Sequence, residues 1–465
     1  MISILRFFAA PLLCALFLGG LIVFNPASIL AQPVLFTYTT PPQPLHIQVR
    51  GAEIHVLCGQ VDNNFNGTQD MGDVPASWVV LSANAATTLR SRQFLWNEGV
   101  GFPCRPAYDF SSNTLYLAQS GRIRAFDTQT QATKRDTVLL LDTLARSAMG
   151  TSGTVAGLSF ARVGIMGQDL LSLTLRGRST SAVVQVLPAT GRVSRRLGAG
   201  IFAQQAIAYT TPVDGVETVI LNEGGFGTST ATLMIADGGN DVTTLNLGDT
   251  GNHLLVSGGQ AIVTMNGSHT IQVIDLATRR IIRTIPTGTT GFNGPREAVL
   301  IGTTLYVTTY ASDVRAFDIL TGREVTRFNP RGKPEGIAAL GNNIIVANAF
   351  EAGGFASANT VVVLNTTTSV QENRAGADVI SLAPNPTQDR TTLRFQGKNG
   401  LGENVRISLV STLGNEIAEL FPVRRTTTGF EAEFSANDLG LAQGMYFVHI
   451  RSAQGMTALP VQIVR

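Results

Sequence analysis

The sequence predicts an all-β chain in which a β-propeller of about seven blades precedes a small C-terminal β-sandwich. Two observations carry this prediction. A unit of short strands recurs at a period near forty residues through most of the chain, and a separate run of short apolar alternations follows it. Such a period, with several strands per unit, is typical of propellers, whose blades bury their faces against neighbouring blades.

Residues 1–31 are predicted to be a secretory signal peptide. They carry one early basic residue, Arg6, then an apolar stretch from Leu12 to Phe24, and a small residue, Ala31, where a signal peptidase can cut. A non-cleaved anchor is the alternative, because the apolar stretch approaches the length of a membrane span. Later apolar stretches are too short, so we expect no transmembrane segment in the mature chain.

The repeated unit defines the propeller, which we place at residues 44–374. One copy begins at Asn113 and closes on Arg-Ala-Phe-Asp at Asp127, and another begins at Thr304 and closes on the same four residues at Asp318. A carboxylate at the closing position can accept backbone N–H bonds in the turn that follows. An earlier unit around residues 54–81 brings the count to about seven blades, and six or eight stay open. Further copies close at Leu187, Asp237, Asp275 and Asn365.

The strands of these units resemble those of a known propeller class. A Leu-Tyr-Val strand, a Val-x-x-Phe-Asp strand and a Thr-Gly turn occur together between Thr304 and Gly322. This combination is similar to surface-layer and YVTN-type propeller repeats. The resemblance implies the fold and leaves the function open, because one fold hosts many functions.

The C-terminal module, residues 375–465, consists of short predicted strands separated by turn residues. It opens on Pro384-Asn385-Pro386, continues through a Leu-Gly turn at Gly414, and reaches a last hairpin through Gly444 and Tyr446. This order and spacing resemble the C-terminal sorting domain of the type IX secretion system, the outer-membrane export route of Bacteroidetes-type bacteria. The resemblance implies that type IX machinery exports the chain to the medium or to the outer-membrane cell surface. An ordinary sandwich without a sorting role is the alternative.

Two cysteines remain once the signal peptide, with its Cys14, is set aside. Cys58 and Cys104 form an even pair in a chain predicted to be exported, and this favours one disulfide between them. Two buried free thiols are the alternative.

A twelve-residue loop before Trp78 predicts a calcium site. Its oxygen side chains stand at the positions that calcium loops of the EF-hand type use, with Gly67 at the sharp turn. The last position carries aspartate in place of glutamate. No helix pattern follows, so we expect a structural calcium site in a loop that connects β-strands. A solvated Asx-rich turn without an ion is the alternative. The predicted ligands are Asp62, Asn64, Asn66, Thr68, Asp70 and Asp73.

A second candidate site comes from two similar Gly-rich loops. Asn222-Glu223-Gly-Gly-Phe and the loop from Asn348 through Glu351 each follow a strand of the unit, and their asparagines stand 126 positions apart, three periods of 42. We therefore expect both loops on one face of the propeller, with these four residues offered to a ligand. The alternative is that the glycines only connect strands.

Composition argues against several other functions. Charged residues make up 14% of the chain and the net charge is +2, so no basic excess predicts a nucleic-acid partner. The five histidines are scattered, and no phosphate loop or nucleophile elbow occurs, so no catalytic residue is predicted.

These observations favour an exported, non-enzymatic propeller used for binding or adhesion, with a surface glycan or protein as its ligand. Two alternatives stay open. One is a calcium-dependent enzyme of the lactonase, lyase or quinoprotein kind that uses Glu223 and Glu351 near the central channel. The other is a structural surface-layer component.

Overall fold

The structure is a computed structural model of the 465-residue chain, and the chain divides into two compact units, Met1–Thr366 and Thr367–Arg465. The predicted signal peptide lies outside the described residues. In the part of the chain that the structure describes, no helix is long and apolar enough to cross a membrane. The described residues are 34–96, 98, 104–119, 121–141, 154–164, 166–211, 215–239, 241–366, 379–385, 387–396, 406–411, 416–420, 422–425, 429–452 and 455–464.

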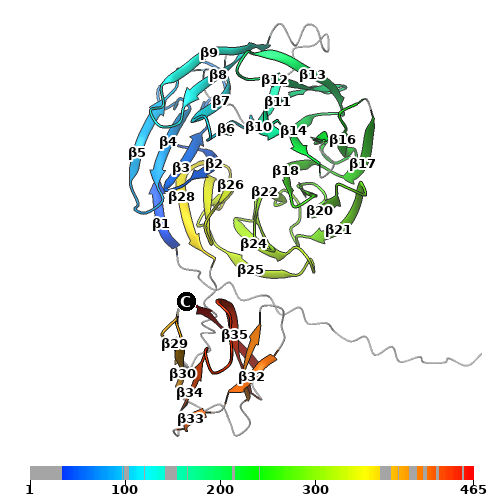
Figure 1. The fold of residues 1–465 in the computed structure, drawn as a ribbon. Coiled ribbons are helices and arrows are strands. Elements are labelled where there is room, and N and C mark those ends of the chain that lie inside the picture. Colours follow the sequence, from blue (N-terminus) through cyan, green and yellow to red (C-terminus); the bar gives the residue numbers. More distant parts are fainter. Residues whose placement is uncertain are drawn as a thin grey trace, which may run out of the picture. The chain divides into compact units, whose positions relative to one another are not determined.

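The first unit is a propeller of seven four-stranded antiparallel blades, which confirms the predicted fold (Figure 1). We number the blades along the chain, and in each the first strand is the innermost. Blade 1 contains β2 (Pro44–Arg50), β3 (Glu53–Cys58), β4 (Ser77–Ser82) and β5 (Thr88–Gln93). Blade 2 contains β6 (Ala107–Asp109), β7 (Thr114–Gln119), β8 (Arg122–Asp127) and β9 (Thr133–Leu140). Blade 3 contains β10 (Thr154–Val163), β11 (Gln168–Arg176), β12 (Ser181–Leu187) and β13 (Arg192–Ala199).

The next three blades repeat the same meander. Blade 4 contains β14 (Ala203–Thr210), β15 (Val216–Asn222), β16 (Ala231–Ala236) and β17 (Val242–Gly248). Blade 5 contains β18 (Gly251–Ser257), β19 (Gln260–Met265), β20 (Thr270–Asp275) and β21 (Arg280–Pro286). Blade 6 contains β22 (Pro295–Ile301), β23 (Thr304–Thr309), β24 (Asp313–Asp318) and β25 (Glu324–Phe328).

Blade 7 closes the ring with a strand from the start of the described chain. It contains β26 (Lys333–Leu340), β27 (Asn343–Phe350), β28 (Ser357–Asn365) and, as its outer strand, β1 (Val34–Thr39). Tyr38 of β1 lies opposite Val361 and donates a hydrogen bond to the carbonyl of Ser82 in blade 1, at 2.6 Å. The propeller therefore begins before residue 44, the boundary that the repeats predict. The repeats do not reveal β1, because it is a single strand that is not followed by the rest of a repeat unit.

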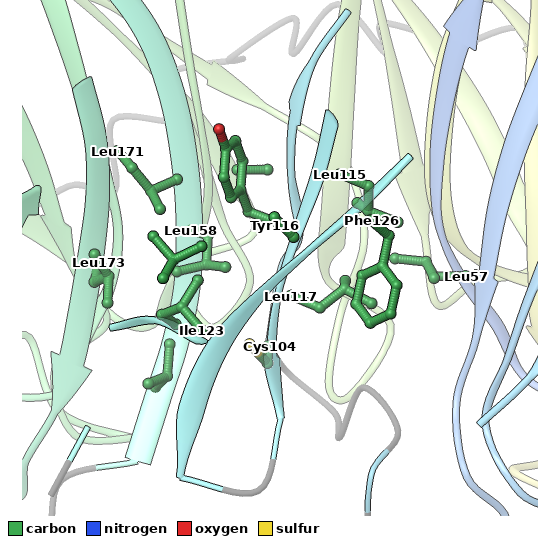
Figure 2. Packing of buried hydrophobic residues seen from close by; sticks show 14 of the residues in the cluster. Leu57, Cys104, Leu115, Tyr116, Leu117, Ile123, Phe126, Leu158, Leu171 and Leu173 are labelled. Atoms are coloured by element: carbon green, nitrogen blue, oxygen red, sulfur yellow. The ribbon is translucent and has the colours of Figure 1, made fainter. Parts of the chain in front are cut away.

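The propeller core consists of apolar clusters between neighbouring blades. In the cluster of Figure 2, Leu57 of blade 1, Leu115 and Phe126 of blade 2, and Leu171 and Leu173 of blade 3 are all buried. Corresponding clusters join blades 4 and 5, blades 5 and 6, and blades 6 and 7. Every blade therefore buries apolar side chains only when its neighbours are in place, which is the usual source of cooperativity in such rings.

The meander assigns every connection to one of two faces. Because consecutive strands are antiparallel, the connection between the second and third strands of a blade lies at the same face as the connection to the next blade. We call this the upper face. It is the face at which each innermost strand begins, and the remaining hairpin turns lie at the lower face.

The predicted role of the closing aspartates is confirmed. Asp127, Asp275 and Asp318 each end the third strand of a blade, and each accepts hydrogen bonds from the backbone in the following turn. In all three, a threonine three residues later donates both its backbone N–H and its hydroxyl. These bonds explain why the Asp-x-x-Thr pattern recurs at the lower face.

The predicted disulfide is not formed, because Cys58 and Cys104 are both buried free thiols. Cys58 ends β3 and packs in the cluster between blades 7 and 1, whereas Cys104 packs in the cluster that blade 2 shares with its neighbours. The two thiols thus belong to different inter-blade cores. Burial raises the pKa of each thiol to about 12, so both stay protonated and unreactive.

The second unit consists of two four-stranded sheets with one core, as predicted for a small β-sandwich. Leu393 and Ala432 from one sheet are buried together with Ile407, Val448 and Val461 from the other. The first sheet contains β29 (Val379–Ala383), β30 (Arg390–Gln396), β34 (Gly429–Ser435) and β33 (Pro422–Arg425). The second contains β32 (Glu416–Leu420), β31 (Arg406–Ser411), β35 (Gly444–Ser452) and β36 (Gly455–Ile463).

Candidate functional site

The predicted calcium loop connects β3 to β4 at the upper face, and its carboxylates bind its own backbone. Asp62 Oδ2 accepts a hydrogen bond from the Gly67 N–H at 2.8 Å, which links the first and sixth loop positions. The Asp73 carboxylate accepts the N–H groups of Asn63 at 2.8 Å and Asp70 at 2.9 Å. The loop is therefore wound around its own carboxylates.

The amide side chains of the loop turn toward its central carboxylate. Asn64 and Asn66 donate to Asp70 Oδ2 at 2.8 Å and 2.5 Å, and these bonds lower the pKa of the Asp70 carboxyl. The side-chain oxygen Oδ1 of Asn66 accepts hydrogen bonds from the backbone N–H and the hydroxyl of Thr68. In this arrangement the two asparagines support the loop through their nitrogens, so ion binding would require their amides to rotate.

The oxygens of this loop fit calcium in kind, since calcium prefers hard oxygen ligands. Asp62 Oδ1 is buried and has no hydrogen-bond partner, so the first loop position keeps one carboxylate oxygen available. Among the described residues, no three His, Cys, Asp or Glu side chains are grouped closely enough to hold a metal. Calcium binding at Asp62 to Asp73 stays a prediction.

The two predicted ligand asparagines occupy equivalent places on blades 4 and 7, and both are fully buried. Asn222 donates to Thr232 Oγ1 at 3.0 Å, and Asn348 donates to Thr360 Oγ1 at 3.0 Å. In each case the partner is the directly opposite residue on the third strand. The amides thus cross-link the second and third strands just below the upper face.

Each asparagine also holds the chain that enters its blade. The Asn222 side chain accepts the N–H of Gly200 at 3.0 Å, and the Asn348 amide donates to the carbonyl of Pro330 at 2.7 Å. A Cβ on Gly200 would lie 2.9 Å from the Asn222 amide, and one on Gly332 would lie 2.6 Å from Asn348. Glycine is required where the connection passes this close, so these asparagines act within the fold. A direct role in ligand binding stays a prediction.

The two predicted glutamates differ in their surroundings. Glu223 is half-buried and forms an ion pair with Arg176, whose guanidinium lies 4.6 Å from the ring centroid of Phe202. Glu351 is exposed, and its backbone N–H donates to the carbonyl of Ala356 to close the turn between β27 and β28. The structure places the pair on the upper face but on blades that are three apart, so the two carboxylates do not form one cluster.

The structure reveals a buried charged cluster that the sequence analysis missed. Glu297, the third residue of β22, forms an ion pair with Arg105, which precedes β6. His46 of β2 lies 3.7 Å from the same carboxylate. Burial alone would raise the pKa of Glu297, but Arg105 and the two nearby histidines hold it well below its usual range. The second of these, His253 of β18, accepts the Ala298 N–H at 3.3 Å, and burial lowers its pKa to about 3.

A second charged pair lies beside the first and joins blade 6 to blade 7. Arg296 donates to both carboxylate oxygens of Glu335, with Nη2 to Oε1 at 2.6 Å and Nε to Oε2 at 3.1 Å. The Tyr310 hydroxyl donates to Glu335 Oε2 at 2.5 Å. The one signal in the sequence is positional, because His46, Glu297 and Glu335 each occupy the third place of an innermost strand.

Exposed apolar side chains gather in the loops of the upper face. Phe226, between β15 and β16, and Phe292, between β21 and β22, are 62% and 73% exposed. Their rings stack with centroids 5.8 Å apart and an interplanar angle of 6°. Other large apolar residues exposed in these loops are Phe65, Met71, Leu95 and Phe355.

An aromatic cluster on blades 6 and 7 surrounds one ammonium group. Lys333, the first residue of β26, places Nζ 3.8 Å from the ring centroid of Phe355 and 5.7 Å from that of Tyr310. Phe350 contacts both aromatic rings edge-on. On its other side Tyr310 packs against Arg296, 4.6 Å from its ring centroid. The cluster thus connects the buried ion pairs to the exposed loop tip.

The predicted sorting motif is tied to the last strand of the C-terminal unit. Asn385 Oδ1 accepts the N–H of Gln462 at 2.9 Å, and the Pro384 carbonyl accepts the Thr391 hydroxyl at 2.8 Å. Gly444 begins β35, and the Tyr446 hydroxyl donates to the carbonyl of Ala442 at 3.0 Å. Pro386 and Gly414 lie outside the described residues.

Comparison with known proteins confirms the predicted sorting domain. Residues 381–463 match the family described as secretion system C-terminal sorting domain. The type IX sorting domain marks the chain as one that the type IX machinery exports, and the protein is secreted or carried at the cell surface. None of the curated proteins compared with the chain matches it.

The propeller is similar to solved structures of low sequence identity. A crystal structure of BBS1N in complex with ARL6DN is 9% identical with a TM-score of 0.50, covering 73% of this chain and 98% of its own. The WD40 beta propeller domain of Doa1 is 16% identical with a TM-score of 0.49, at the same coverage. At such identities the likeness concerns the fold alone.

Proposed function

We propose that this protein is an exported, non-enzymatic propeller that binds an extracellular ligand at its upper face, in adhesion or capture at the cell surface. The observation that carries the proposal is the exposed stacked pair of Phe226 and Phe292. Their loops belong to different blades, so the pair exists only because the ring brings them together. Exposed aromatic groups of this kind are typical of binding surfaces, since water solvates them poorly.

The distribution of exposed apolar residues supports the same face. Phe65, Met71, Leu95 and Phe355 all lie in connections at the upper face, around the ring from blade 1 to blade 7. Exposed carboxylates such as Asp70 and Glu351 stand among them. Apolar anchors within a polar rim are the usual composition of a recognition surface.

The buried charged cluster supports a role without chemistry. Glu297 is engaged by Arg105 and His46, and Glu335 is engaged by Arg296 and Tyr310. Carboxylates held in this way are poor candidates for acid or base work on a substrate, because a catalytic group needs reach to the substrate proton. The cluster instead holds the starts of the innermost strands, on which the upper loops stand.

Binding of the purified full chain to an array of immobilised polysaccharides and surface proteins tests the proposal. Phe226→Ala combined with Phe292→Ala is expected to weaken binding about tenfold or more, because buried aromatic anchors dominate interface energies. Leu320→Ala is the matched control, since Leu320 is 62% exposed in a turn at the lower face. Equal loss in the control, or none in the aromatic variant, would remove the upper face as the binding surface.

A further inference from the structure

We infer that Lys333 and the aromatic side chains around it form a subsite for an acidic sugar, a pyranose ring that bears a carboxylate. The inference rests on the proposed ligand-binding function of the upper face and names the chemistry of the ligand there. Lys333 lies at the start of β26, directly below the exposed tip at Phe355.

Lys333 carries an unmatched charge. Three Lys or Arg residues are buried among the described residues, namely Arg105, Arg315 and Lys333. Arg105 pairs with Glu297, and Arg315 pairs with Asp313 at 3.0 Å. No carboxylate of the described residues pairs with Lys333, although only 7% of it is exposed. A buried charge without a counter-ion is costly, which is why proteins rarely keep one without a use for it.

The aromatic rings compensate for part of that cost. An ammonium 3.8 Å from the Phe355 centroid is attracted by the negative face of the ring, and Tyr310 adds a second, more distant face. Burial still lowers the pKa of Lys333 from its ordinary value. The ammonium is therefore held in place, partly desolvated, and lacks an anion, which is the state in which an incoming carboxylate gains most.

An exposed aromatic ring lies next to the ammonium. Phe355 remains 57% exposed while Lys333 covers one face of its ring. The remaining ring surface can stack on the apolar C–H face of a sugar. A uronic acid carries both required parts, since its carboxylate projects from the edge of the ring. The neighbouring Arg296 is already held by Glu335, so it does not compete for the anion.

The test uses the full chain and four defined polymers in titration calorimetry. Polygalacturonate supplies carboxylates on sugar rings, dextran sulfate supplies a different anion on sugars, polyglutamate supplies carboxylates on a peptide, and dextran is neutral. We expect polygalacturonate to bind, and Lys333→Gln to weaken that binding about tenfold or more, as for loss of a charge-assisted contact. Phe355→Ala is expected to weaken it less, because it removes stacking and leaves the ion pair.

Two controls make the result specific. Lys134→Gln removes a lysine whose Nζ donates to the carbonyl of Ser112 at the lower face, and it is expected to leave binding unchanged. The melting temperature of Lys333→Gln should equal or exceed that of the parent, because an unmatched buried charge is removed. A lower melting temperature together with unchanged binding would mark Lys333 as structural and overturn the subsite.

The remaining outcomes also decide the question. If dextran sulfate binds as tightly as polygalacturonate and its binding also depends on Lys333, the proposal that the subsite selects a carboxylate is wrong. If polyglutamate binds equally tightly, the proposal that the ligand is a sugar is wrong, and a protein partner is favoured. No binding of polygalacturonate would overturn the subsite altogether. Array binding that depends on Phe226 and Phe292 but not on Lys333 would keep the proposed function while rejecting this inference.

Discussion

Arg105 and Glu297 form a buried ion pair between side chains 192 positions apart in the sequence. Arg105 precedes the innermost strand of blade 2, and Glu297 lies in the innermost strand of blade 6. The pair therefore joins opposite parts of the ring, where the inner strands come together (Figure 1). His46 of blade 1 adds a second contact to the same carboxylate. Neighbouring blades are held by apolar packing, and this pair holds blades that are not neighbours.

Glu297→Gln should destabilise the propeller by about 3 kcal/mol, because it leaves the Arg105 charge buried without its counter-ion. Urea unfolding of the full chain, followed by circular dichroism, measures the loss. Glu324→Gln is the control, since Glu324 pairs with Arg327 at the surface and such pairs contribute about 1 kcal/mol or less. A loss at Glu297 no larger than that at Glu324 would contradict the role of the cross-ring pair.

Stability should fall as the pH drops below about 6.5, because His253 is buried in its neutral form. Its folded pKa of about 3 lies below the ordinary value of 6.5, so its contribution is fully present above pH 6.5 and is lost progressively toward pH 3. Linkage gives a loss on the order of 2 kcal/mol between pH 7 and pH 5.

Denaturant midpoints across this pH range measure the His253 effect. His253→Gln should flatten the slope between pH 7 and pH 5, whatever its effect at neutral pH. His55, whose pKa burial lowers to about 4, contributes a nearly equal slope of the same sign in this pH range and stays in the variant, so the variant should keep about half of the slope. An unchanged slope in the variant would assign the acid sensitivity to other groups.

The parts of the fold that local pattern determines were predictable from the sequence. Asp127 and Asp318 close their strands through bonds to residues two or three positions away, so the same short motif recurs with the same structure. Asn222 and Asn348 were rightly placed on one face at equivalent positions, because the period carries them there. Their burial was not predictable, since it depends on Gly200 and Gly332, which pass close to them in the connections that enter from the preceding blades.

The charged cluster shows where sequence reasoning ends. His46 and Glu297 are far apart in sequence and neither stands in a recognisable motif, so nothing local indicates that they meet. The two residues come together only when the ring closes, and closure depends on the packing of all seven blades. Cys58 and Cys104 show the opposite error, because compartment and parity favour a disulfide while the two thiols belong to different inter-blade cores.

Reducing agent should leave the melting temperature of the propeller unchanged, because Cys58 and Cys104 are free thiols. A structural disulfide would typically contribute about 2–4 kcal/mol, so its reduction would lower the melting temperature by several degrees. Scanning calorimetry with and without dithiothreitol makes the comparison. Thiol labelling adds a second readout, since both groups should react only after denaturant exposes them.

Asn222→Ala should cost about 1–3 kcal/mol, because it leaves the N–H of Gly200 and the hydroxyl of Thr232 without the partner that the buried Asn222 amide provides. Asn293→Ala is a matched control, since Asn293 is exposed in a loop of the same face. Urea midpoints of the two variants separate these effects. Similar midpoints would mean that the amide does not hold the incoming connection.

Calcium should raise the melting temperature of the full chain if the Asp62 to Asp73 loop binds it, because a ligand that binds only the folded state stabilises that state. At a hundredfold excess over the dissociation constant the gain is about 2.7 kcal/mol. Asp62→Ala combined with Asp73→Ala should abolish the shift, while the variant without calcium melts lower because the Gly67 and Asn63 N–H groups lose their acceptors. Scanning calorimetry in calcium and in chelator measures both effects. If calcium does not shift the melting temperature of the parent, the loop is a turn held by its own hydrogen bonds, and the upper face has no calcium site in this loop.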